Sequence, residues 1–130
     1  MVSTIQNTNC KLTTKDLVKF ILANRGGTNA YLDWSIPEII SHLLWCVENG
    51  TLCYCAVDGR VTGVMTGIYR MDSYYVTNIL SIERNMPHFI SYILRTFPTA
   101  KTISTNRHGR FHKSYPLDNR TIERFMKGTK

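Results

Sequence analysis

The dipeptide Asp58-Gly59 separates two runs of β-prone residues and restricts the fold more than any other feature of this sequence. The runs extend from Leu52 to Val57 and from Val61 to Tyr69. A DG pair between two such runs is a strong signal for an antiparallel hairpin. A second turn at residues 71–73 leads into a third run rich in aromatic and β-branched residues, Tyr74 to Ile82. The sequence therefore predicts a three-stranded antiparallel meander.

Two helices are predicted before the meander. Thr13 or Thr14 can cap a first helix that runs to about Asn24, where Arg25-Gly26-Gly27 ends it. The second helix has Ser35 as its N-cap, Pro37 in its first turn and Glu38 at the capping-box position, and it ends at 49–50. Its apolar positions are spaced for a buried face, on which Trp45 fits the core; they are Ile39, Ile40, Leu43, Leu44 and Val47.

After the meander, Pro87 opens a third helix that Pro98 ends. A short strand at 101–105 and a returning strand at 111–115 follow, and a small helix begins at Asp118 or Asn119. This order predicts an α+β domain in which a mixed sheet, containing the antiparallel meander, is flanked by helices. With 130 residues and 43% hydrophobic residues, the chain is expected to form a single domain, 1–130, with a basic C-terminal hairpin and tail at 101–130.

The composition excludes a disordered tail, a collagen-like chain and a large multidomain enzyme. No apolar run approaches the roughly 18 residues of a membrane span, and the first residues lack the pattern of a secretory signal. We therefore expect a soluble, intracellular protein without a membrane partner. The four cysteines, Cys10, Cys46, Cys53 and Cys55, have no zinc-ligand spacing, so buried free thiols and no metal site are predicted.

The positive charge is concentrated in the last fifty residues. Residues 1–80 contain six Lys/Arg and six Asp/Glu, whereas residues 81–130 contain ten and three, which accounts for the whole net charge of +7. A polyanion, a phosphate-bearing cofactor or an acidic protein surface could bind that half, and a solvated basic face is the alternative.

The element order and several local phrases resemble the GNAT superfamily of N-acyltransferases. The phrase ENGTLCYCAVDGRVTGVMTG looks like the second and third strands of that family. The phrases YYVTNILSIERNMPHFISYILRTFP and KTISTNRHGR look like its fourth strand, following helix and fifth strand in the short members encoded by bacteriophages. The resemblance implies a GNAT-like mixed sheet whose fourth and fifth strands splay apart. Acetyl-CoA lies in that gap in the family.

By the same resemblance, the cofactor-binding candidates are Leu80, Ser81, Ile82, Arg84 and Asn85. In the family, a glycine-rich turn after the fourth strand closes its backbone N–H groups around the pyrophosphate at a helix N-terminus. The corresponding segment here, 83–88, has no glycine, Pro87 removes one N–H donor, and Glu83 adds a negative charge. This departure predicts weakened cofactor binding, with no cofactor expected unless the protein is an active, acetyl-CoA-dependent enzyme.

Catalytic residues are not identified by the sequence. The family often uses a tyrosine near the departing thiolate, on a helix that comes after an Asn following the fifth strand. Asn106 and Tyr115 offer such a pair, but the residues between them indicate a turn and a strand, so packing at a strand end is the alternative for Tyr115. Asp58, Asp72 and Glu83 are bases by location alone, and Asp58 is better explained by its turn.

The basic segment after residue 100 is a second candidate site. Its contact residues would be Arg107, His108, Arg110, His112 and Lys113. Basic groups interleaved with Phe111 and Tyr115 can bind single-stranded nucleic acid, and an edge hairpin can also dock on another protein. Tyr31 and Trp34 lie in a loop, where a lid on the core or a partner site are the two interpretations.

These observations favour a non-catalytic GNAT-like scaffold that acts as an interaction or structural protein. The resemblance suggests a bacteriophage virion or accessory component, in the virion or in the cytoplasm of the host cell. Its partners would be other proteins, with nucleic acid as a further ligand of the basic half. The alternative is an acetyl-CoA-dependent N-acetyltransferase with a degenerate pyrophosphate turn.

Overall fold

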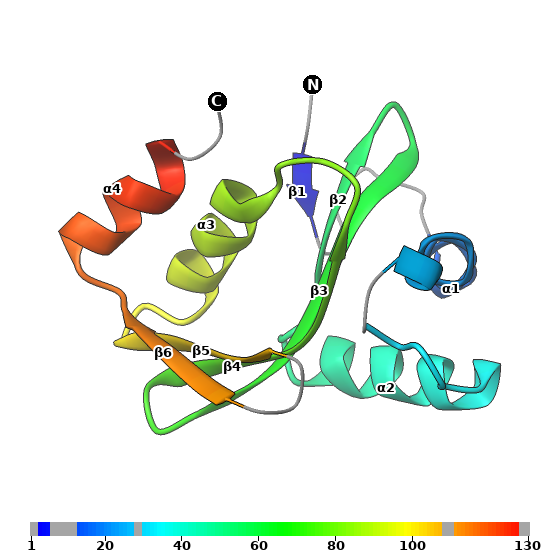
Figure 1. Ribbon diagram of the computed structural model, residues 1–130, viewed down its shortest axis with the longest axis horizontal. Coiled ribbons are helices and arrows are strands. Elements are labelled where there is room, and N and C mark those ends of the chain that lie inside the picture. Colours follow the sequence, from blue (N-terminus) through cyan, green and yellow to red (C-terminus); the bar gives the residue numbers. More distant parts are fainter. Residues whose placement is uncertain (1–2, 6–12, 28–29, 108–110, 128–130) are drawn as a thin grey trace.

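A single six-stranded sheet organises the chain in the computed structural model, which describes residues 3–5, 13–27, 30–107 and 111–127. The strands lie in chain order, β1 to β6, and all neighbours are antiparallel except the parallel pair β4 and β5. The sheet curves strongly, with α1 and α2 on one side and α3 and α4 on the other (Figure 1). The elements are β1 (Ser3–Ile5), α1 (Thr14–Asn24), the 3-10 turn η1 (Arg25–Gly27), α2 (Ile36–Glu48), β2 (Cys53–Val57), β3 (Arg60–Arg70), β4 (Ser73–Ser81), α3 (Met86–Thr96), β5 (Thr102–Arg107), β6 (Phe111–Pro116) and α4 (Asn119–Lys127).

Capping boxes begin both helices on the first face, as the sequence predicts for α2. Thr13 accepts from the backbone N–H of Asp16, whose carboxylate accepts from the Thr13 N–H. Ser35 and Glu38 form the same reciprocal pair at α2. Each pair satisfies two helix N-terminal donors, which stabilises the start of the helix by about 1 kcal/mol.

Two tight turns build the meander, and both use left-handed residues. Asp58 and Gly59 have φ values of 51° and 79°, which is the pattern of a type I′ hairpin turn. Met71 and Asp72 have φ values of 51° and 59° at the second turn. The predicted antiparallel meander is confirmed, and the role of Asp58 as a turn residue explains its position.

Two features at the ends of the chain differ in how far the sequence predicts them. The small C-terminal helix is confirmed as α4, where Asp118 accepts from the N–H of Thr121. Strand β1 is not predicted, because three residues are too short to show a periodicity; it pairs with β2 from Ser3 opposite Ala56 to Ile5 opposite Tyr54. None of the helices within the described ranges combines the length and the apolar character that a bilayer crossing requires.

The sheet separates two hydrophobic clusters. One lies under α1 and α2 and includes Ile21, Leu43 and Val64; the other lies under α3 and includes Tyr74 and Ile93. The predicted buried thiols are confirmed for the described cysteines, Cys46, Cys53 and Cys55, whereas Cys10 lies outside the described residues.

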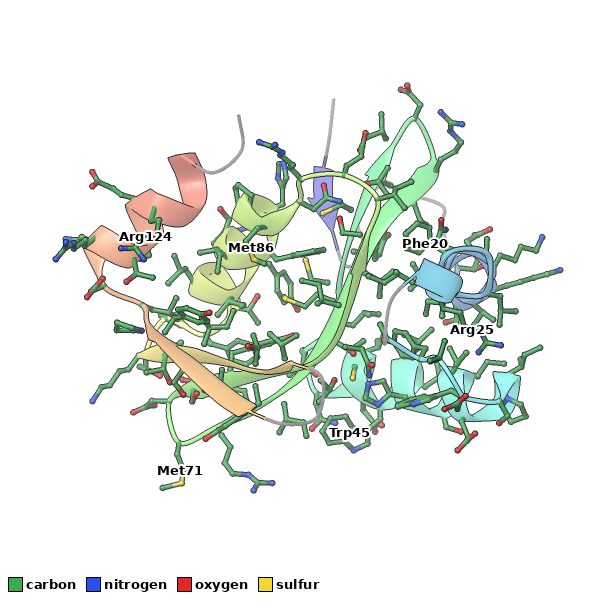
Figure 2. The ribbon with its side chains drawn as sticks, in the orientation of Figure 1. Phe20, Arg25, Trp45, Met71, Met86 and Arg124 are labelled. Atoms are coloured by element: carbon green, nitrogen blue, oxygen red, sulfur yellow. The ribbon has the colours of Figure 1, made fainter. Side chains whose placement is uncertain are left out.

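The prediction for the core face of α2 is wrong in part. Trp45 is 44% exposed and lies at the outside of α2 (Figure 2), and Ile40, Leu44 and Val47 are also exposed. The reason is that α2 covers the sheet with one side only, the side of Ile39, Leu43 and Cys46. Helical spacing shows which residues share a side, but it does not show which apolar side meets the sheet.

Gly67 is predicted to be essential for packing against β4. A Cβ at this position would lie 2.5 Å from both the Tyr74 ring and the Tyr75 carbonyl oxygen, and a backbone oxygen cannot move aside. We expect Gly67→Ala to lower the free energy of unfolding by about 2 to 3 kcal/mol, as overpacking does. Urea denaturation checks this, and Gly26→Ala is the control, because a Cβ there meets nothing within 4 Å and the change should be within about 0.5 kcal/mol. Equal effects of the two variants would contradict the packing argument.

Candidate functional site

The sheet splits between β4 and β5. In the described part of the chain, β5 pairs with β4 only from Ser73 opposite Thr102 to Val76 opposite Thr105. β4 continues to Ser81, so its segment 77–81 has no ladder partner on the β5 side. Strand edges of this kind present backbone N–H and C=O groups to a ligand or another chain. The predicted splaying of these strands is therefore present.

A β-bulge lies where the pairing stops. Thr66 of β3 is opposite Asn78 and Gly67 is opposite Val76, so β4 has one extra residue, Thr77, at this point. A bulge bends its strand and increases the local twist. The bend accounts for the divergence of β4 from β5 beyond Val76.

Five polar side chains meet beside the bulge, on the face covered by α2. We call them the His42 cluster; its members are Tyr31, His42, Cys46, Thr66 and Thr77. His42 Nε2 lies 3.1 Å from Thr66 Oγ1, 3.4 Å from Thr77 Oγ1 and 3.6 Å from Cys46 Sγ. Thr66 Oγ1 also lies 3.0 Å from both Thr77 Oγ1 and the Tyr31 hydroxyl.

Burial sets the protonation states in this cluster. Desolvation lowers the pKa of His42 and raises the pKa of the Cys46 thiol and of the Tyr31 phenol. The imidazole is therefore neutral at neutral pH, and the thiol is protonated. Because Cys46 is also fully buried, it does not have the exposure of a nucleophile. Within the cluster, His42 is the group that could accept a proton. Thr77 is exposed and its hydroxyl contacts the imidazole, so a proton from outside could reach His42 through this hydroxyl.

The loop between α1 and α2 holds the cluster from outside. Arg25 donates to the carbonyl oxygens of Tyr31 at 3.1 Å and of Trp34 at 2.8 Å. The Trp34 ring meets the His42 ring edge-on, with centroids 5.0 Å apart. Tyr31 is fully buried and Trp34 half-buried, so these two residues pack over the core rather than standing free on a loop.

Three backbone N–H groups of the turn after β4 donate within the chain. The N–H of Ile82 donates to Thr62 O, that of Asn85 to Glu83 O, and that of His88 to Asn85 O. Pro87 has no N–H, so the first turn of α3 has lost one donor, and the His88 bond occupies a second. A diphosphate therefore meets few aligned donors at this helix N-terminus, next to the carboxylate of Glu83.

Asn85 is turned into the protein. It is 2% exposed and occupies the N-cap of α3, but its side chain makes no capping bond and its φ of −102° is not left-handed. Its amide nitrogen instead contacts Ser81 Oγ at 2.8 Å and Thr62 O at 3.3 Å. The amide thus holds the turn against Thr62 of β3, which lies at a second bulge in the pairing of β2 and β3, and Asn85 directs no side-chain donor outward from the helix N-terminus.

The other cofactor-binding candidates lie along the same strand end. Leu80 is buried in the cluster under α1 and α2, and Ser81 donates its hydroxyl to Glu83 O. Ile82 and Arg84 are exposed on the turn. The five candidates are brought together at the end of β4, and their role toward a cofactor stays a prediction.

The catalytic-tyrosine arrangement suggested for the family is not formed by the described backbone. β5 ends at Arg107 and β6 begins at Phe111, so only three residues join the two strands, too few for a helix. Tyr115 lies in β6 opposite Ile103, half-buried against the cluster under α3, as the packing interpretation predicts. Asn106 lies opposite His112 in the same hairpin.

The basic candidate residues that the structure describes lie in this β5–β6 hairpin. Arg107 ends β5, and His112 and Lys113 belong to β6, whereas His108 and Arg110 lie outside the described residues. Binding of nucleic acid or protein by this segment stays a prediction. Over the ranges that the structure covers, no group of three His, Cys, Asp or Glu side chains could hold a metal ion.

Sequence reasoning missed the His42 cluster. His42 contacts Thr66 and Thr77 across 24 and 35 residues of the chain, and no motif joins them. The one available signal was weak: a histidine and a cysteine at i and i+4 share a helix face, which places both on the side of α2 that meets the sheet.

Two solved structures share this fold. The ribosomal-protein-S18-alanine N-acetyltransferase from Escherichia coli matches with a TM-score of 0.58 and 9% identity, over 98% of this chain and 76% of that one. An acetyltransferase of the GNAT family from Streptococcus pneumoniae matches with a TM-score of 0.55 and 9% identity, over 98% and 83%. No protein-family model and no curated protein matches the sequence. The chain therefore has the α+β GNAT fold, which by itself does not assign an activity.

The neutral state of His42 makes stability depend on pH. Burial lowers the pKa of His42 below its ordinary value of 6.5. As the pH falls below about 6.5, the imidazole is therefore protonated in the unfolded chain before it is protonated in the folded chain, which favours unfolding. We expect the free energy of unfolding to decrease from pH 7.5 to pH 5, and to decrease less in His42→Gln. Urea denaturation of both proteins at several pH values measures this. An identical pH dependence in the variant would show that His42 does not carry the effect.

Proposed function

We propose that this protein is a GNAT-fold scaffold that acts by binding other proteins and does not turn over acetyl-CoA. The observation that carries the proposal is the internal use of backbone N–H donors at the N-terminus of α3. The N–H groups of Ile82, Asn85 and His88 already donate within the chain, and Pro87 contributes none. The GNAT fold is thus retained, while the place that would hold a diphosphate offers few donors and adds the negative charge of Glu83.

The surface of α2 supports a role in binding proteins. Five of the nine exposed large hydrophobic side chains among the described residues belong to this one helix. Exposed apolar side chains that are concentrated in one place are typical of interaction sites, whereas singly scattered ones are ordinary.

The proposed setting is a bacteriophage virion or an accessory component in the infected host cell. Its support is the likeness of residues 74–98 and 101–110 to the short GNAT-like proteins of bacteriophages. Nucleic acid is a further proposed ligand, because residues 81–130 contain ten of the 16 Lys/Arg residues.

A titration with acetyl-CoA tests the proposal. We expect no binding heat and no change in melting temperature at about 5 mM acetyl-CoA, since a ligand below its Kd adds little to the stability of the folded state. An active GNAT-fold acetyltransferase in the same buffer is the positive control. A saturable rise of several degrees would overturn the proposal.

The alternative function is acetyl-CoA-dependent N-acetyl transfer, and one observation favours it. The neutral imidazole of His42 stands 3.4 Å from the hydroxyl of Thr77, at the bulge where β4 leaves β5. A base in this place could take a proton from an amine at the mouth of the split.

Two variants separate the alternative from the scaffold proposal. If the protein is an enzyme, Arg84→Glu should raise the Kd for acetyl-CoA at least tenfold, because it reverses a charge beside the turn. His42→Gln should leave that Kd unchanged and reduce kcat by about 100-fold, the usual contribution of a general base. Equal kcat values for wild type and His42→Gln would remove His42 from the chemistry.

A further inference from the structure

A stripe of apolar side chains runs along the outer flank of α2. It consists of Ile36, Ile40, Leu44 and Val47, which are 49%, 37%, 53% and 48% exposed. Their spacing of 4, 4 and 3 residues keeps them within an arc of about 80° over a length of about 16 Å. The four residues, which we call the α2 stripe, therefore form one continuous row rather than scattered contacts.

The α2 stripe contains no charged residue. Glu38 and Glu48, the acidic residues of α2, lie about 165° and 85° from its centre on a helix with 3.6 residues per turn. Both carboxylates stay in water when another surface covers the stripe, so covering it leaves no unpaired buried charge.

We propose that the α2 stripe binds the α2 stripe of a second copy, antiparallel about a twofold axis. This inference rests on the proposed scaffold function and names the partner. In the antiparallel arrangement Ile36 lies opposite Val47 of the second copy, and Ile40 lies opposite its Leu44. The row is thus complementary to itself, as a twofold interface requires. The helix dipoles of the two copies also oppose each other.

A second copy fits the stripe better than the basic half of the chain does. Among residues 81–105 and 114–124, whose side-chain exposure the structure describes, Ile82 is the only exposed large hydrophobic residue. An apolar row is stabilised by an apolar surface, and the stripe of the next copy is such a surface. Head-to-tail docking on the basic half would leave the stripe facing charged side chains.

The distribution of charge allows two copies to approach through α2. Residues 81–130 form α3, α4, β5 and β6, and both of these helices lie on the face of the sheet opposite α2 (Figure 1). The segment 26–59 contains no Lys or Arg. Contact through α2 therefore leaves α3 and α4 of each copy on the side of its sheet that faces away from the contact.

The exposed area limits the strength of this dimer. The four side chains expose on the order of 300 Å² per copy, so the pair covers about two thirds of the apolar area in a standard interface of about 1,600 Å². We therefore expect a reversible dimer that is half dissociated on the order of 10 µM, at the weak end of specific interfaces.

Sedimentation equilibrium of the full chain between about 1 and 500 µM is the first test. A monomer–dimer equilibrium is the expected result. A chain that remains monomeric at 500 µM would overturn the inference, and so would growth beyond dimers, because a head-to-tail contact does not close. The acetyl-CoA titration tests the scaffold function separately. If the protein is monomeric and does not bind acetyl-CoA, the dimer inference is overturned and the scaffold proposal stands.

Charge-swap variants test which surface is used. One protein carries Ile40→Glu and Leu44→Glu, and another carries Ile40→Lys and Leu44→Lys; both positions are exposed, and both new residues favour helix. Each variant alone should be monomeric, with Kd raised at least tenfold, and their mixture should form a 1:1 heterodimer. Circular dichroism establishes that both are folded.

Met71→Lys is the matched control. Met71 is 88% exposed at the β3–β4 turn, away from α2 (Figure 2), and the substitution should leave the Kd within twofold. The inference would be overturned if either charge-swap variant alone still dimerised like the wild type, or if Met71→Lys abolished the dimer. Either result would show that another surface forms the contact.

Discussion

The end of hydrogen bonding between β4 and β5 at Val76 is the constraint on which the rest of the structure depends. It coincides with the bulge at Thr77, which bends β4 away from its parallel neighbour. In the part of the chain that the structure describes, the β5-side edge of β4 is thereby left without a ladder partner over residues 77–81. The same bend places the hydroxyl of Thr77 against His42 of α2, so the split in the sheet and the polar cluster have one origin.

A second bulge, at Thr62 of β3, has the opposite effect on the neighbouring turn. The Thr62 carbonyl accepts from Ile82 and from Asn85, and these bonds draw the turn after β4 back onto the sheet. Donors that could have faced a phosphate are used to hold the turn in place. The GNAT fold therefore keeps its split while the adjacent turn uses three of its N–H donors inside the chain, because the two features depend on different bulges.

Helix α2 carries apolar residues on two sides, and only one of them meets the sheet. Ile39, Leu43 and Cys46 are fully buried, whereas the α2 stripe faces outward. In an isolated domain, the apolar side chains of α2 that lie outside its core-facing side stay in water and add nothing to stability. These side chains contribute to stability once a second surface covers them.

The sequence alone determined the local elements of this protein. The N-cap at Thr13, the capping box at Ser35, the Asp58-Gly59 turn and the prolines around α3 each act over a few residues, so their effects can be seen in a short window of sequence. These signals also yielded the α+β class and the likeness to the GNAT fold. Strand β1 was not predicted, because its pairing with β2 depends on residues about fifty positions away in the sequence.

Only the tertiary structure decided which of these residues meet. The contacts of His42 with Thr66 and Thr77, the inward turn of Asn85 and the exposure of Trp45 depend on how helices lie on the sheet. Periodicity assigns a residue to one side of its own helix or strand, but it does not state what lies opposite. That choice belongs to packing between distant segments, which minimises the exposed apolar area of the whole chain rather than of any one element.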